Sequence, residues 1–292
     1  MPAHGAYGFR LEYRGGDGRL RDLVELGDEA PLVTLRWRHA CPATTFDDHA
    51  VGRASMGTRG ATAFYVTAEP RSVLFDIGVA PDPDALVHPI AAVPLAILAR
   101  WRGHVTLHGG AFEAAGEAWA LLGEREAGKS TALGILAGLG CAVVADDLLV
   151  LDDGFVLAGP RCVDLREDAA ERLGPARDLG LVGPRRRLRL SGRPAPACLP
   201  LGGFFLLEWA DEPLVQTERL PLPERVPLLH RLEYAGLVGP ADPLKVLDLA
   251  GLPAWRVRRP RDWEATEDAV QRMLELALAT GSAPPAMRTG VT

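Results

Sequence analysis

The stretch 118–147, AWALLGEREAGKSTALGILAGLGCAVVADD, decides the fold of this chain of 292 residues. An apolar strand precedes a glycine-containing loop, a helix follows the loop, and a second short apolar strand ends in two aspartates. Residues 123–131, GEREAGKST, match the phosphate-loop pattern G-x-x-x-x-G-K-[ST]. Because this pattern lies between a strand and a helix, as the motif requires, the sequence predicts an α/β nucleotide-binding core.

In a loop of this kind, glycines let successive backbone N–H groups turn toward an anion, and the helix N-terminus adds partial positive charge. We expect Lys129 to reach the β- and γ-phosphates of ATP, and the Ser130 hydroxyl to contact Mg²⁺. The loop also carries two glutamates, whose side chains must point outward if the backbone binds phosphate. The predicted nucleotide-binding residues are Gly123, Glu124, Arg125, Glu126, Ala127, Gly128, Lys129, Ser130 and Thr131.

Two pairs of adjacent aspartates occur within 143–156, VVADDLLVLDDGFV. Asp146 and Asp147 end a strand that directly follows the loop's helix, and strand–helix–strand order places that end beside the loop. Asp152 and Asp153 precede a glycine between two apolar runs, which is the pattern of a tight turn. The first pair is therefore predicted to be chemical and the second structural.

Adjacent acids push their proton affinities apart, so one of the first pair can stay ionised while the other exchanges a proton. One carboxylate is expected to accept the proton of an alcohol and the other to contact Mg²⁺, and the sequence leaves their assignment open. The side chains of neighbouring strand residues point to opposite faces. The chain must therefore bend at Asp146–Asp147 for both to serve one site.

The overall composition is that of a soluble globular protein, with 48% hydrophobic and 24% charged residues. A net charge of −6 argues against nucleic acid as a partner. Neither a secretory signal nor an apolar run of membrane-spanning length is apparent, so we expect no membrane association and a cytoplasmic location. The cysteines lack metal-binding spacing and are expected to be reduced thiols; they are Cys41, Cys141, Cys162 and Cys198.

A His-Gly pair, the phosphate loop, a helix ending in glycine and then Ala-Asp-Asp form an ordered set that resembles the HPr kinase/phosphorylase family. The resemblance covers about residues 104–170. It implies an α/β fold with the P-loop core of the HPr kinase/phosphoenolpyruvate carboxykinase type and a mixed sheet, here preceded by an N-terminal β-rich region. The first hundred residues do not resemble the HPr enzyme, so the chain is more similar to HPr-kinase-related peptide Ser/Thr kinases, such as those of lasso peptide biosynthesis.

The resemblance also implies roles for individual residues. The segment 163–167, VDLRE, takes the place of the family's Glu-x-Arg-Gly segment, which makes Arg166 a phosphate contact. The family's loop usually has glycine where Glu126 stands. The implied catalytic residues are Asp146, Asp147, His108 (near the transferred phosphate) and Lys129, and the implied metal ligands are Ser130, Asp147 and Asp164.

Strand and helix patterns organise the rest of the chain. Strands are predicted at 7–14, 31–38 and 62–77 (a hairpin broken near Pro70), a loop at 50–60, and a hairpin at 148–158. Helices are predicted from residue 88, with Gly103 after the helix and Pro94 delaying or kinking it, at 128–138 and at 262–279. The predicted domains are an N-terminal β-rich region (1–87), a P-loop kinase domain (88–279) and a disordered tail (280–292).

Two basic clusters have less specific patterns. The run Arg185, Arg186, Arg187 and Arg189 fits either a solvated edge or a site for an acidic peptide or phosphate. The segment 255–263, WRVRRPRDW, fits either packing of a helix on the core or stacking on adenine and phosphate binding.

The sequence therefore predicts an ATP- and Mg²⁺-dependent kinase that phosphorylates a Ser/Thr hydroxyl of a peptide or small protein. A switch GTPase is disfavoured, because guanine selection usually uses an Asn-Lys-x-Asp motif and the chain has no Asn. An ABC-type ATPase is disfavoured as well, because LSGRP at 190–194 lacks the rest of that signature. The alternative is a non-catalytic nucleotide-binding sensor or slow ATPase, since glutamates in the loop disfavour nucleotide. Phosphorylase activity stays open, and so does a homo-oligomer, since relatives are often multimeric.

Overall fold

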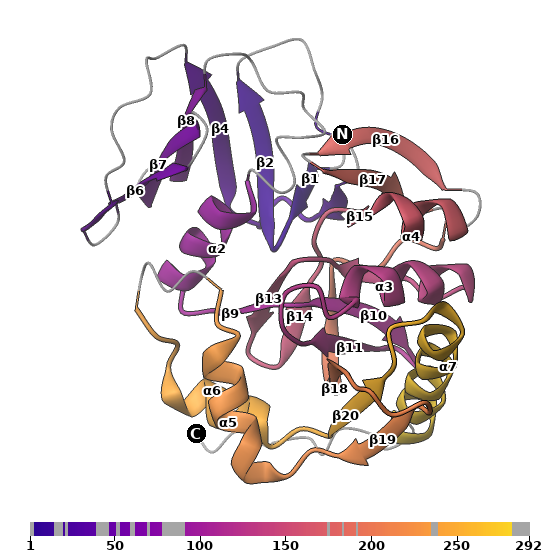
Figure 1. Ribbon diagram of the computed structural model, residues 1–292. Helices are drawn as coiled ribbons and strands as arrows, with labels where there is room; N and C mark the ends of the chain where they lie inside the picture. Colours follow the sequence, from indigo (N-terminus) through magenta and orange to yellow (C-terminus); the bar gives the residue numbers. More distant parts are fainter. Residues whose placement is uncertain are drawn as a thin grey trace.

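The computed structural model describes residues 3–14, 20, 23–38, 47–50, 53–58, 62–68, 71–77, 91–173, 176–182, 184–190, 192–234 and 239–281. Within these ranges the protein is mixed α/β, with a large mixed sheet, an N-terminal β-sheet, a small third sheet and helices packed on them (Figure 1). None of the helices in these ranges is long and apolar enough to cross a membrane. Cys41 and residues 282–292 of the predicted tail lie outside the described residues.

The N-terminal sheet has eight strands in the order β3-β1-β2-β4-β8-β7-β6-β5. They are β1 Ala3–Ala6, β2 Phe9–Arg14, β3 Val24–Leu26, β4 Leu32–Arg38, β5 Asp47–Ala50, β6 Arg53–Thr58, β7 Thr62–Ala68 and β8 Arg71–Ile77. The strands predicted in this region are confirmed, including the hairpin β7–β8. The loop predicted at 50–60 is wrong, because β6 pairs antiparallel with β7 along its whole length. Backbone pairing with a neighbouring strand outweighs the local glycine content there.

The large sheet has nine strands, seven of them in the order β12-β10-β11-β18-β14-β13-β9, with β20 on β18 and β19 on β20. They are β9 Val105–His108, β10 Gly110–Ala114, β11 Glu117–Leu122, β12 Val143–Ala145, β13 Leu148–Asp152, β14 Phe155–Leu157, β18 Cys198–Trp209, β19 Gln216–Arg219 and β20 Ala254–Arg259. Both β11 and β12 pair antiparallel with β10, so they run in the same direction. The phosphate loop after β11 and the acid pair after β12 therefore leave the sheet at one edge.

Helices cover both faces of the large sheet (Figure 1). Their bounds are α2 Ala92–Trp101, α3 Lys129–Gly138, α4 Glu167–Arg172, α5 Leu222–Arg231, α6 Pro243–Ala250 and α7 Trp263–Thr280. The predicted helices are confirmed, and Pro94 is accommodated in the first turn of α2, where backbone N–H groups have no intrahelical partner. Helices α3 and α7 pack against each other, and α2 lies between the large sheet and β7 of the N-terminal sheet.

A small antiparallel sheet, β15-β17-β16, supports one side of the site. Its strands are β15 Cys162–Leu165, β16 Arg177–Val182 and β17 Arg185–Arg189. Helix α3 packs against β15, and α4 packs against β17. The basic run is thus a strand of this sheet, and it brings Arg187 into the interior.

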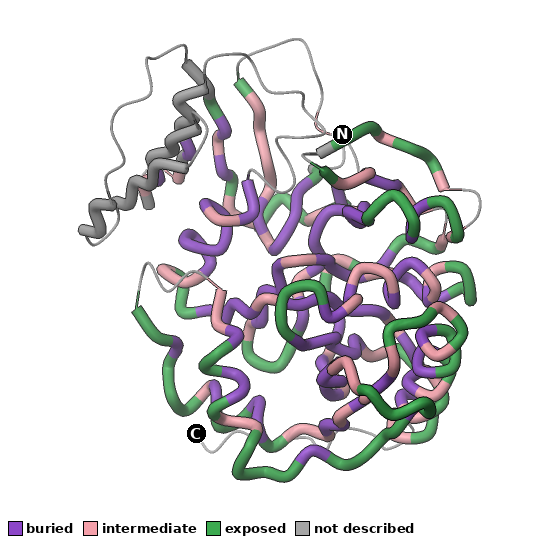
Figure 2. Tube along the Cα trace, viewed as in Figure 1, coloured by how far each residue is buried: buried purple, intermediate pink, exposed green. Residues whose placement is uncertain are grey.

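The apolar core runs through the middle of the molecule, where Figure 2 shows the buried segments gathered. One cluster joins the N-terminal sheet to α2, β9 and β13. Tyr7, at the tip of the β1–β2 hairpin, is fully buried, and its N–H donates to the Ala158 carbonyl (2.7 Å). The second cluster lies beneath α3 and α7 and contains Phe112, Trp119, Phe205 and Trp255. The predicted boundary at residue 87 falls outside the described residues, and the first cluster packs the two regions together.

Candidate active site

The phosphate-loop sequence forms the connection between β11 and α3, and three of its residues have positive φ. They are Gly123 (146°), Glu126 (68°) and Gly128 (82°). Gly128 is suited to its positive φ, and a Cβ there would lie 2.6 Å from Arg259 Nη2, so a side chain would also displace that guanidinium. Glu126 adopts the left-handed conformation at a strain of order 1–3 kcal/mol. The loop therefore keeps a glycine-like backbone at a position that carries a side chain.

Four carbonyl groups of the loop accept hydrogen bonds from side chains. Lys129 Nζ donates to Gly123 O (2.9 Å) and Glu124 O (3.0 Å), Trp209 Nε1 to Glu126 O (2.9 Å), and Arg259 Nη2 to Ala127 O (2.7 Å). Within a peptide plane the N–H points opposite to the C=O. Side chains that hold the carbonyls thus orient the loop's N–H groups, which is how such a loop presents amides to an anion.

The side chains of both loop glutamates are exposed, and each forms an ion pair with an arginine. Glu124 pairs with Arg231 on α5 (3.0 Å), and its side chain is 71% exposed. Glu126 pairs with Arg166 (2.6 Å) and is 53% exposed. Arg166, for which the sequence suggested a phosphate contact, is therefore bound to the loop itself in this structure.

Asp146 and Asp147 lie in a strained turn after β12. The Leu148 N–H donates to Asp146 O (2.9 Å), and the middle residue of this three-residue turn, Asp147, has φ 69°. Turns of this hand are rare and strained, and strained backbone is concentrated at functional sites. The bend expected from the sequence is thus present, and both aspartates line one cleft.

The Asp146 carboxyl group connects the acid pair to the phosphate loop. Its Oδ1 accepts from Ser130 Oγ (2.9 Å), and its Oδ2 accepts from the backbone N–H of Asp164 (3.4 Å). Burial, reinforced by the negative charge of Asp147, raises the pKa of Asp146 to about 7, against the opposing effect of the Ser130 hydrogen bond. This carboxyl group can therefore exchange a proton near neutral pH.

His108 lies between Asp147 and Lys129. Its Nδ1 is 3.2 Å from Asp147 O and 3.4 Å from Asp147 Oδ1, and its Nε2 is 3.2 Å from Lys129 Nζ. Burial and the charge of Lys129 lower the pKa of His108, so the neutral ring is favoured. Lys129 can only donate, so Nε2 accepts and the proton belongs on Nδ1, facing Asp147. Burial also lowers the pKa of Lys129, against the opposing charges of Asp146 and Asp147.

Asp164 lies next to Asp146, and a buried arginine binds its carboxylate. Arg187 Nε donates to Asp164 Oδ1 (2.8 Å) and Arg187 Nη2 donates to Asp164 Oδ2 (3.0 Å). Both side chains are buried. A metal ion at Asp164 would have to share oxygens that Arg187 already binds, so the carboxylate's charge is largely balanced within the protein.

A cleft of about 1160 Å³ unites these groups. The predicted residues that line it are His108, Arg125, Glu126, Gly128, Lys129, Ser130, Thr131, Asp146, Asp147, Asp164 and Arg166. Three other predicted loop residues, Gly123, Glu124 and Ala127, are not among the residues that line it. Gly123 and Ala127 are buried parts of the loop, and Glu124 faces solvent.

The sequence did not single out two further residues that line this cleft, Trp209 and Tyr234. Trp209 ends β18 and binds the loop. The Tyr234 ring centroid lies 6.3 Å from that of His108, and burial together with the charge of Asp147 raises the pKa of Tyr234. Both residues lie far from the loop in sequence and outside any motif, so only spatial proximity identifies them.

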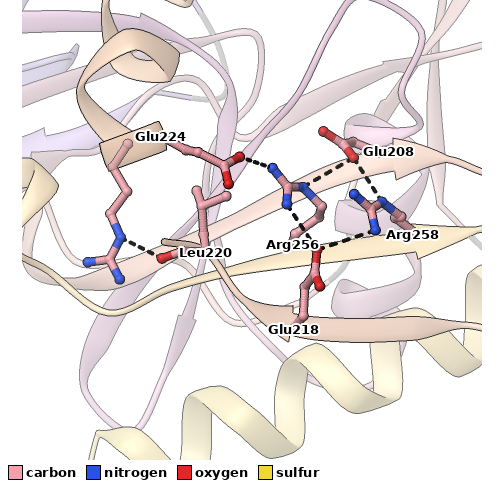
Figure 3. A network of polar contacts seen from close by, with 7 residues as sticks. Glu208, Glu218, Leu220, Glu224, Arg256 and Arg258 are labelled. Carbon is pink, nitrogen blue, oxygen red and sulfur yellow. Dashed lines mark hydrogen bonds and ion pairs between the residues drawn. The ribbon is translucent and has the colours of Figure 1, made fainter. Parts of the chain in front are cut away.

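The side chains of the segment 255–263 are divided between two faces, because successive residues of β20 point to opposite sides of the strand. Arg256 and Arg258 point to one face of β20 and pair with Glu208 and Glu218, a network drawn in Figure 3. The opposite face of β20 carries Trp255 and Arg259, and the latter reaches the phosphate loop. Trp263 and Arg261 line the cleft.

The site offers oxygen ligands that suit Mg²⁺. No group of three or more His, Cys, Asp or Glu side chains in the described ranges is arranged to hold a metal ion. Mg²⁺ in phosphoryl-transfer sites needs only one or two carboxylates, because waters and substrate phosphates complete its shell. Ser130, Asp146 and Asp147, which line one cleft, fit that requirement.

Comparisons with known proteins find distant structural likeness. No protein-family model and no curated protein matches the sequence. Among solved structures, the chain is similar to the Hpr(Ser) kinase/phosphatase from Coxiella burnetii, with 13% identity and a TM-score of 0.28, over 60% of this chain and 98% of that one. With a score this low, the roles of the residues have to be argued from the geometry of the site.

Proposed function

We propose that this protein is a cytoplasmic, ATP- and Mg²⁺-dependent kinase that transfers the γ-phosphoryl group to a Ser/Thr hydroxyl of a peptide or small protein, as HPr-kinase-like serine kinases do. One observation carries the proposal. Ser130, in the first turn of the loop's helix, donates to Asp146 at 2.9 Å. The phosphate loop and the acid pair thus form a single site in one cleft.

Each group of the site has a part in this reaction. The oriented loop amides and Lys129 would bind the polyphosphate. Mg²⁺, held by Ser130 and the acid pair with Asp164 behind them, would neutralise charge on the transferred group. His108, through Nε2, would hold the Lys129 ammonium in place.

The acid pair would supply the base. A carboxyl group with a pKa of about 7 is ionised in a large fraction of molecules at neutral pH, yet basic enough to accept an alcohol proton. The Asp147 side chain is 33% exposed, so it is the more accessible of the two to an incoming acceptor. Both roles, base and metal contact, require the ionised form of Asp146.

The size of the cleft supports a peptide or protein as acceptor. Sites for small ligands usually enclose roughly 300–1,000 Å³. The cleft of about 1160 Å³ exceeds that range, which leaves room for an acceptor segment beside a nucleotide. Arg172, Arg185 and Arg261 line it together with the loop, so acidic residues near the acceptor hydroxyl would find partners.

A transfer assay tests the proposal. The full-length protein is incubated with γ-labelled ATP, Mg²⁺ and Ser/Thr-containing peptides, including those encoded by neighbouring genes. We expect labelled peptide with the wild type and none with Lys129→Ala. Asp153→Asn, at an exposed turn, is the matched control that should keep activity. Consumption of ATP without labelled peptide would favour the slow ATPase or sensor, and absence of nucleotide binding would refute both.

A further inference from the structure

Arg187 and Arg259 are the most deeply buried arginines among the described residues, and their electrostatic surroundings differ. Arg187 is 1% exposed and binds the carboxylate of Asp164. Arg259 is 0% exposed, and its Nε and Nη1 have no hydrogen-bond partner among the described residues. Burial lowers the pKa of Arg259 to about 10, and no carboxylate in the described ranges contributes an opposing effect. Arg259 is thus a buried cation without a protein countercharge in that part of the chain.

This cation lies directly behind the phosphate loop. Its Nη2 donates to the carbonyl of Ala127 (2.7 Å), and a Cβ on Gly128 would come within 2.6 Å of the same nitrogen. The guanidinium carbon lies 4.2 Å from the centroid of the Trp209 ring. Trp209 in turn donates to the carbonyl of Glu126 (2.9 Å). The stacked pair Arg259–Trp209 therefore supports the side of the loop opposite to its amides.

An unpaired buried charge is unfavourable, and proteins retain one mainly where a ligand or metal supplies its partner. In a weakly polarisable interior its field is also less screened than that of a surface charge. An anion bound to the loop amides would lie within this field. The charge of Lys129, the buried cation within the loop, is already opposed by Asp146 and Asp147.

We infer that Arg259 is the built-in countercharge of the loop's ligand, a positioning residue that holds the loop from behind and favours a di- or triphosphate group over an uncharged nucleoside. The inference deepens the proposed function. It depends on that function in one respect, namely that the loop's ligand is a phosphate group. Arg259 does not line the cleft, so it acts through the loop and not by direct contact.

Two variants separate charge from shape. Arg259→Gln keeps a donor for the Ala127 carbonyl and removes the charge, whereas Arg259→Lys keeps the charge and removes the planar fork. Arg258→Met is the matched control, because it removes a neighbouring arginine of the same strand that faces the surface network of Figure 3. Binding of inorganic tripolyphosphate, ATP and adenosine to the full-length protein is measured by calorimetry at two salt concentrations.

We expect Arg259→Gln to weaken the binding of tripolyphosphate and ATP about tenfold or more, as loss of a charged partner does, with a shallower salt dependence. Adenosine binding should be unchanged. Arg259→Lys should stay within about threefold of the wild type, and Arg258→Met should bind like the wild type. A purely structural role of Arg259 would instead weaken all three ligands together and lower the unfolding temperature of the free protein.

The inference is overturned if Arg259→Gln binds tripolyphosphate as tightly as the wild type, or if Arg259→Lys loses as much affinity as Arg259→Gln. Should Arg259→Gln fail to fold, Arg259→Lys decides alone. Wild-type-like affinity then supports the countercharge, and a tenfold loss refutes it. A wild-type protein that binds neither tripolyphosphate nor ATP would refute the proposed function itself, which is a different result from any difference among the variants.

Discussion

The two pairs of adjacent aspartates, on either side of β13, have opposite surroundings. Asp146 is 4% exposed, and burial raises its pKa to about 7. Asp153 has an 80% exposed side chain, and its hydrogen bond to Lys245 lowers its pKa. Yet each pair contains one residue with positive φ, Asp147 at 69° and Asp153 at 44°. Both pairs form tight turns, and the turn predicted at the second pair is confirmed.

The difference shows that a turn of two aspartates becomes a chemical site only through what covers it. Ser130 and the backbone of Asp164 reach the first pair from α3 and β15. The second pair lies at the tip of the β13–β14 hairpin, where Lys245 on α6 is the partner of Asp153. Local sequence is similar in the two pairs, so the raised proton affinity of Asp146 comes mainly from burial under other elements, which the exposed second pair lacks.

The largest expected effect separates the two pairs by activity. Asp146→Asn should lower kcat of phosphoryl transfer by roughly 10²–10⁴-fold, because it removes the carboxylate that the proposed reaction uses as base or metal contact. Asp152→Asn, at the second pair, should leave kcat close to the wild-type value. Initial rates with labelled ATP and a saturating peptide measure both. Equal losses in the two variants would show that the pairs do not differ in role.

Glycine substitutions at the two positive-φ positions sharpen the comparison. Asp147→Gly and Asp153→Gly both relieve backbone strain, so each should change the free energy of unfolding by no more than about 1 kcal/mol. Only Asp147→Gly should reduce transfer, by about 10–100-fold, because it also removes a carboxylate of the site. Urea unfolding and transfer rates are measured on the same preparations. An Asp147→Gly protein with full activity would leave its carboxylate without a role.

The pH dependence of stability provides a third comparison. The pKa of Asp146 is raised from 3.8 to about 7, so the folded state keeps a proton that the unfolded chain loses. The stability that the folded state gains from this proton is fully present below about pH 4. It is lost as the pH rises toward 7, at about 1 kcal/mol per pH unit. Transfer should change in the opposite direction and fall as the pH drops below 7, because ionised Asp146 is required.

Asp146→Asn should remove this pH dependence of unfolding, measured in urea at pH 5 and pH 7. Asp153 contributes with the opposite sign, since its lowered pKa gives stability that is lost as the pH falls, and its exposure keeps that contribution small. If the free energy of unfolding of the wild type changed between pH 5 and pH 7 no more than that of Asp146→Asn, the raised pKa of Asp146 would be contradicted.

The smallest expected effect concerns the ion pair of the second acid pair. Lys245 Nζ lies 2.9 Å from Asp153 Oδ1, and the carboxylate is largely exposed. Lys245→Gln should change the free energy of unfolding by less than about 1 kcal/mol, with no change in transfer, because water and salt screen such pairs. Thermal unfolding at low and high salt measures the difference. A larger loss would mean that the hairpin tip supports the fold more than its exposure suggests.

Much of the fold could be predicted because its signals are local. The phosphate loop, the helix after it and the hairpin at 148–158 depend on glycine positions and on short periodic patterns. The segment 50–60 was misassigned because its pairing partner, β7, and not its own composition, makes it a strand. In α7 the helix is confirmed, but its apolar residue Leu278 is 49% exposed, since the packing partners decide which face is buried.

The site was predictable only in part, because some of its contacts join residues that are far apart in the sequence. Lys129, Ser130 and Asp146 come together because a strand–helix–strand unit brings its ends to one edge of a sheet. No local pattern indicates that Arg187 binds Asp164 or that Arg259 lies behind the loop, because these contacts join β15 to β17 and β20 to the loop.

The sequence by itself determined which groups can meet a phosphate and an alcohol: the glycine-bearing loop, its lysine and serine, and an acid pair one strand later. The tertiary structure decided how these groups are charged and held. The pKa of about 7 on Asp146 arises from burial and from the charge of Asp147, and burial places Arg259 where no carboxylate of the described residues opposes its charge. Proton affinity depends on the surrounding dielectric and charges, which a linear pattern of residues does not contain.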